Sequence, residues 1–132
     1  MEKYIIIAGV IQIVLGLIHI TFPKRFNWSI ELKGLSLINR QMMVVHTFFI
    51  ALTVFLMGVL SLLYSAELVT LPFGRVISLG IGIFWLVRLF FQFFVYSKDL
   101  WKGKRFETIM HILFAITWVY LAAVYLTTYY KI

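Results

Sequence analysis

The sequence of 132 residues has no cysteine, only two prolines and few charged residues, which make up 13% of the chain. Without cysteine there can be no disulfide, no thiolate metal ligand and no covalent haem attachment. Ordinary globular domains have about 25% charged residues. Carboxylates are the scarcest charged groups here, with 5 Asp and Glu against 12 Lys and Arg. The low charge therefore argues against a water-soluble fold.

Several recognisable site motifs are also missing. The sequence has no glycine-rich phosphate loop, no nucleophilic serine motif and no paired Glu-x-x-His set of a di-iron centre. No row of carboxylates crosses an apolar segment, as a proton pump would need. The net charge of +7 is compatible with nucleic acid, but the basic residues lie beside apolar segments and suit anionic lipid better. We therefore expect membrane lipids, and not nucleic acid, as partners.

Long apolar segments dominate what is present, since 63% of the residues are hydrophobic. Four segments reach the roughly 17–25 residues that cross about 30 Å of hydrocarbon. They cover residues 4–22, 41–65, 76–97 and 106–129. Pro23 follows the first segment and Pro72 precedes the third, at positions where a helix tolerates proline. We predict one transmembrane domain over residues 1–132, an all-α integral membrane protein folded as a four-helix up-and-down bundle.

The basic residues divide unequally between the two faces of such a bundle. The face with the first and third connections has eight, namely Lys24, Arg25, Lys33, Arg40, Lys98, Lys102, Lys104 and Arg105. The face with the termini has three, namely Lys3, Arg75 and Lys131. By the positive-inside rule the first face is cytoplasmic. We therefore predict a bacterial-type inner membrane protein with both termini extracytoplasmic and a first span that is retained.

Polar side chains inside the predicted spans are few, and a charged one costs on the order of 2.5–3.5 kcal/mol at mid-membrane. They are Gln12, His19, His46, Arg88, Gln92, His111 and, at the head of the fourth span, Glu107. The predicted topology places the histidines, Arg88 and Gln92 in the cytoplasmic leaflet. Helical spacing puts these residues on inward-facing stripes. The stripes are Gly9-Gln12-Gly16-His19, Trp85-Arg88-Gln92-Tyr96 and Glu107-His111-Ala115-Trp118-Ala122-Tyr125.

This layer predicts a ligand pocket lined by His19, His46, His111, Arg88 and Gln92. The leading version is a haem b electron-transfer protein, because membrane haem commonly lies between histidines of separate helices. The spacing Arg40, His46, Phe49 recurs as Arg105, His111, Phe114, which favours His46 and His111 as the axial pair and two related helix hairpins. Gly9 and Gly16 would admit either a flat macrocycle or a closely packed helix.

Other versions of the pocket stay open. Three histidines can bind zinc or copper and leave a position for an activated water, with Glu107 as ligand or base, which would make the protein an enzyme. A lipid or quinone ligand is a third version. A non-catalytic accessory subunit, in a homo-oligomer or a larger membrane complex, is a fourth. Arg88 has no carboxylate partner in the four spans, so we expect it to meet backbone carbonyls, a lipid phosphate, a haem propionate or another anion, or to extend to the lipid headgroups.

Overall fold

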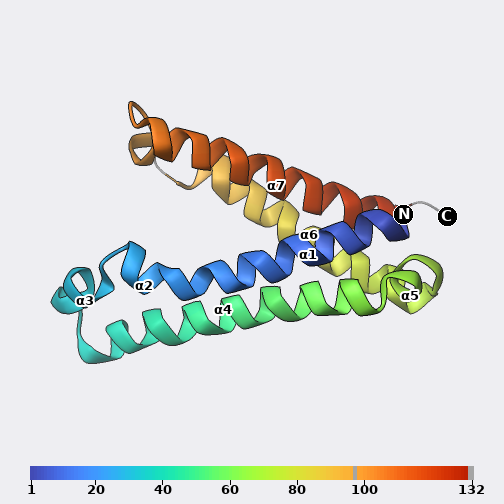
Figure 1. Cartoon of the computed structure of the whole chain (residues 1–132), viewed down its shortest axis with the longest axis horizontal. Coiled ribbons are helices and arrows are strands. Elements are labelled where there is room, and N and C mark those ends of the chain that lie inside the picture. Colours follow the sequence, from blue (N-terminus) through green and yellow to red (C-terminus); the bar gives the residue numbers. More distant parts are fainter. Residues whose placement is uncertain (97, 131–132) are drawn as a thin grey trace. The chain divides into compact units, whose positions relative to one another are not determined.

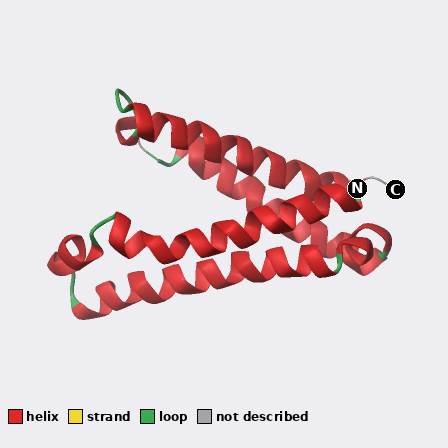
Figure 2. Ribbon diagram, viewed as in Figure 1, coloured by secondary structure: helices red, strands yellow, loops and turns green. Residues whose placement is uncertain are grey.

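The computed structural model describes residues 1–96 and 98–130, and every regular element in that part of the chain is a helix (Figure 2). The long helices are α1 (Glu2–Ile18), α4 (Leu37–Leu63), α6 (Pro72–Phe94) and α7 (Arg105–Tyr130). The short ones are η1 (His19–Thr21), α2 (Phe22–Arg25), α3 (Trp28–Glu31), η2 (Leu32–Gly34), α5 (Ser65–Thr70) and η3 (Lys98–Leu100). Ser97, where the third predicted span ended, and Lys131, which entered the basic count, lie outside the described residues.

Four helical segments are long and apolar enough to cross a membrane, which confirms the all-α class and the four predicted apolar helices. They run over Glu2–Arg25, Leu37–Leu63, Pro72–Phe94 and Arg105–Tyr130. Two of them begin four residues earlier than the sequence predicts. The Ser36 hydroxyl accepts a hydrogen bond from the Asn39 amide at 3.4 Å, so α4 starts at Leu37 and not at residue 41. Helix α6 starts at Pro72 and not at residue 76. Proline fits there because the N–H groups of a first helical turn have no partner within the helix, so the missing proline N–H is not needed.

The chain forms two compact units, each of which is described by itself. One consists of Ile6–Leu63 and the other of Met1–Ile5 with Tyr64–Ile132. Each contains one pair of long helices that are antiparallel and side by side, α1 with α4 and α6 with α7 (Figure 1). The single up-and-down bundle of all four helices stays a prediction.

Glycines let α1 and α4 pack with their backbones in close approach. A Cβ atom on Gly9 would lie 2.8 Å from the Gly58 carbonyl oxygen, and one on Gly16 would lie 3.0 Å from the Ala51 carbonyl oxygen. Small residues at a membrane helix interface allow this approach and the dispersion contacts that come with it. Gly9 and Gly16 therefore serve helix packing, and α4 already occupies the face on which a macrocycle would have to lie.

The α6–α7 pair buries part of each stripe that the sequence predicts for those two helices, while Tyr96 and Glu107 at the ends of the stripes are exposed. Trp85 and Gln92 of α6 are buried, as are Ala115, Trp118, Ala122 and Tyr125 of α7. Gly82 permits close packing here too, because a Cβ atom on it would lie 2.9 Å from Leu126 Cγ. At the opposite end from η3, α5 packs on α6 through a hydrogen bond from the Ser78 hydroxyl to the Leu68 carbonyl, at 3.5 Å. The described residues of this pair include three buried polar ones, Ser78, Gln92 and Thr128, and of these Gln92 makes hydrogen bonds to side chains of the partner helix.

Candidate functional site

Gln92 is the centre of a hydrogen-bond network between α6 and α7. Its Oε1 accepts from Trp118 Nε1 at 3.3 Å and from Arg88 Nη1 at 3.4 Å. Its Nε2 donates to the His111 carbonyl at 3.3 Å and lies 2.8 Å from His111 Nδ1. Helical spacing produces this convergence, since residues 88 and 92 are four apart on α6 and residues 111 and 118 are two turns apart on α7.

The network determines the tautomer of His111. An arginine guanidinium and an indole N–H can only donate, so the amide oxygen of Gln92 must face Arg88 and Trp118. The amide NH₂ group of Gln92 therefore faces His111 Nδ1, which must accept. A neutral imidazole with an accepting Nδ1 carries its proton on Nε2. His111 thus presents an N–H donor at Nε2, and this atom makes no hydrogen bond within the described residues.

Aromatic rings hold the His111 imidazole in place. The ring stacks on Trp101 with centroids 3.8 Å apart at 14°, and Phe93 meets its edge at 6.0 Å. The Thr108 hydroxyl donates to the Trp101 carbonyl at 2.6 Å, which ties the segment after η3 to the first turns of α7. The imidazole therefore has one defined orientation against α6.

Arg88 lies between two aromatic side chains. Its Cζ atom is 5.2 Å from the ring centroid of Tyr96 and 5.2 Å from that of Trp118, both within the range of a cation–π interaction. Trp118 also stacks on Trp85, with ring centroids 5.0 Å apart, and on Phe114, with centroids 5.7 Å apart. A guanidinium has five N–H donors. Arg88 uses one in the bond to Gln92 and makes no ion pair within the described residues.

We call these five residues the Arg88 cluster: Arg88, Gln92, Tyr96, His111 and Trp118. Three of them, Arg88, Gln92 and His111, are predicted pocket residues that the structure brings together. Sequence reasoning did not name Tyr96 or Trp118 as site residues, although both lie on the predicted stripes. The signal was available: Tyr96 is four residues after Gln92, and Trp118 is seven after His111, so each shares a helix face with a polar residue.

The structure does not add the other predicted pocket residues to this cluster. His19 is in η1, and its Nδ1 is 2.7 Å from the Leu15 carbonyl oxygen. His46 is exposed on α4. Both residues belong to the unit Ile6–Leu63. Glu107 is exposed in the first turn of α7. Among the described residues no three His, Cys, Asp or Glu side chains are placed to hold one metal ion. The three-histidine site with Glu107 therefore has no support from the geometry.

Ligation of iron or zinc by His111 would disrupt the network. Nδ1 is occupied by the Gln92 amide, and a lone pair on Nε2 would require the proton to move to Nδ1, where it would face the Gln92 N–H. The geometry of the Arg88 cluster instead presents hydrogen-bond donors. Such a site recognises ligands that carry acceptor oxygens.

Comparisons of the chain with family models, with curated proteins and with solved structures found no match.

Proposed function

We propose that the chain is an integral membrane protein with four spans that binds the headgroup of an anionic phospholipid at the Arg88 cluster. The observation that carries the proposal is the pair of donors without acceptors: the remaining N–H groups of Arg88 and the Nε2–H of His111. Phosphate oxygens are strong acceptors that match the guanidinium geometry. This is the lipid-binding version of the predicted pocket.

The location of Arg88 favours a headgroup over a deeply buried ligand. Arg88 is six residues before the end of α6, or about 9 Å along a helix that rises 1.5 Å per residue. Its guanidinium packs on Tyr96, which follows the last turn of α6. The side chain thus extends toward the helix end, as arginines near a membrane interface do. A phosphate at that level would be within its reach.

The connection between α6 and α7 adds positive charge beside the cluster. Lys98, Lys102, Lys104 and Arg105 are all exposed there. Basic residues near a membrane surface attract anionic lipid by about 1 kcal/mol each. In our proposed topology this connection and the α2–α3 segment are cytoplasmic and the termini are extracytoplasmic, in keeping with eight basic residues on one face and three on the other.

The experiment compares Arg88→Gln with Arg40→Gln, which removes the same charge from the predicted cytoplasmic face but from outside the cluster. Native mass spectrometry of the full chain, released from nanodiscs of phosphatidylglycerol and phosphatidylcholine, measures which lipid is retained. We expect wild type and Arg40→Gln to retain phosphatidylglycerol. We expect Arg88→Gln to bind it about 10–100-fold more weakly, because a hydrogen bond to a charged group contributes about 1.5–3 kcal/mol.

Equal lipid retention by wild type and Arg88→Gln would refute the headgroup site and leave simple extension of the arginine to the interface. If Arg40→Gln lost as much phosphatidylglycerol as Arg88→Gln, lipid binding would depend only on the total charge. A Soret band in the purified protein would replace the proposal with the haem b version. His111 could then ligate iron only after the Gln92 contact had broken.

A further inference from the structure

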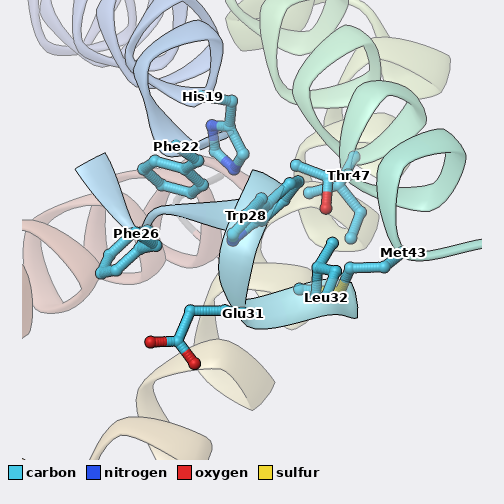
Figure 3. A pocket seen from close by; sticks show the side chains of 9 residues that line it. His19, Phe22, Phe26, Trp28, Glu31, Leu32, Met43 and Thr47 are labelled. Atoms are coloured by element: carbon cyan, nitrogen blue, oxygen red, sulfur yellow. The ribbon is translucent and has the colours of Figure 1, made fainter. Parts of the chain in front are cut away.

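A hollow of about 470 Å³ lies within the unit Ile6–Leu63, where η1, α2, α3 and η2 fold over the first half of α4. Nine residues line it: His19, Phe22, Phe26, Trp28, Glu31, Leu32, Met43, Thr47 and Ile50 (Figure 3). Its volume falls in the range of about 300–1,000 Å³ that is usual for small-molecule sites. None of these residues belongs to the Arg88 cluster.

His19 presents a hydrogen-bond acceptor to this hollow. Its Nδ1 lies 2.7 Å from the Leu15 carbonyl oxygen. A carbonyl can only accept, so Nδ1 carries the proton and the neutral ring has its lone pair on Nε2. Figure 3 shows the imidazole directed toward the indole of Trp28. His19 therefore has the opposite tautomer to His111. Its Nε2 accepts a hydrogen bond, whereas the Nε2–H of His111 donates one.

Two further polar groups in the lining have unused hydrogen-bonding capacity. The indole N–H of Trp28 and the hydroxyl of Thr47 make no hydrogen bond within the described residues. The indole can donate, and the hydroxyl can donate or accept. The lining therefore presents one acceptor, His19 Nε2, one donor, the Trp28 N–H, and the Thr47 hydroxyl, which can donate or accept. A ligand that carries both a hydroxyl and a second oxygen would satisfy all three.

The lining also determines the charge and the shape of the ligand. Glu31 is the only lining residue other than His19 that can ionise, and in Figure 3 its carboxylate points away from the other labelled side chains. The hollow has no lysine or arginine to neutralise an anion. His19, Phe22, Phe26 and Trp28 supply aromatic rings, and His19 and Phe22 already lie 4.6 Å apart. Such rings favour a flat aromatic partner, and the lack of a basic side chain in the lining disfavours an anionic one.

We propose that the hollow binds a neutral phenolic amphiphile of the hydroquinone class. One ring hydroxyl donates to His19 Nε2, and the second oxygen accepts from Trp28 or Thr47. A phenol fits better than an aliphatic alcohol, because the surrounding aromatic side chains can pack on its ring. This site is independent of the proposed headgroup site.

The first test uses the wild-type chain in detergent, so it does not depend on any variant folding. Calorimetry under argon measures the binding of an alkyl-benzohydroquinone, of its dimethyl ether and of 1-decanol. We expect one molecule of hydroquinone to bind per chain. We expect binding about 10-fold weaker for the ether, which leaves His19 without a donor, and weaker still for decanol, which lacks the ring. Equal affinity for the hydroquinone and either analogue would refute the proposal.

The second test uses matched histidine variants. His19→Phe should weaken hydroquinone binding about 10-fold, whereas His46→Phe should leave it unchanged, because His46 is exposed and does not line the hollow. Thr47→Val, next to His46 in the chain, should weaken binding about threefold. Arg88→Gln should have no effect, which separates this site from the headgroup site. An equal loss in His19→Phe and His46→Phe would exclude the hollow as the site.

Discussion

Two glycines of α6, two residues apart, allow the packing of α6 on α7 to be tested with a matched pair of substitutions. A Cβ atom on Gly82 would lie 2.8 Å from Leu126 Cδ2, 2.9 Å from Leu126 Cγ and 3.1 Å from the Leu126 backbone nitrogen. A Cβ atom on Gly80 would meet nothing within 4 Å. Gly82→Ala and Gly80→Ala therefore add the same methyl group to the same helix, once against α7 and once into open space.

The magnitude follows from these distances. Ordinary contact of a Cβ atom begins near 3.4 Å, so the Leu126 backbone must move by about 0.3 Å and its side chain must rotate. Inserting a methyl group into a packed interface costs about 1–3 kcal/mol, and the movable side chain favours the lower half of that range. The helix-propensity gain of about 0.5–1 kcal/mol from Gly to Ala applies to both variants. We expect Gly82→Ala to be about 1–2 kcal/mol less stable than Gly80→Ala.

The measurement is reversible unfolding in mixed micelles with increasing dodecyl sulfate. Tryptophan fluorescence is the readout, because the stacked indoles of Trp85 and Trp118 separate when α6 leaves α7. Gly80→Ala should unfold at the wild-type detergent fraction or above it, and Gly82→Ala at a lower one. Equal stability of the two variants, or a more stable Gly82→Ala, would refute the close packing of Gly82 on Leu126.

Two further predictions concern the network and the topology. Gln92→Leu should lower the free energy of unfolding by about 2 kcal/mol in the same titration, because three partners lose hydrogen bonds of about 0.6 kcal/mol each in a membrane and the Trp118 N–H stays buried. Thr117→Val, whose hydroxyl bonds only its own helix at the Leu113 carbonyl, should change it by less than about 0.5 kcal/mol. For the topology, a reporter enzyme that is active only outside the cytoplasm should be active when it is fused after Ile132. Activity at that position of a reporter that works only in the cytoplasm would reverse the predicted orientation.

Much of the fold could be predicted because it depends on properties that are local along the chain. Length and hydropathy alone identify helices that can cross a bilayer, since a spanning segment must satisfy its own backbone hydrogen bonds. The period of 3.6 residues then placed Arg88 with Gln92, and His111 with Trp118, on common faces. Helix starts were less accurate, because the Ser36 cap and the Pro72 first turn extend α4 and α6 by a few residues.

The roles of the histidines could not be read in the same way. In the sequence His19, His46 and His111 are equivalent residues near the ends of apolar segments, and the repeated spacing favoured His46 with His111. Whether an imidazole donates or accepts depends on the atom that meets its Nδ1. That atom is a carbonyl four residues earlier in the chain for His19 and an amide of another helix for His111. The sequence by itself determined four apolar helices and their polar stripes, while only the tertiary structure decided which nitrogen of the His111 ring is free, because a hydrogen bond between helices depends on how the helices pack.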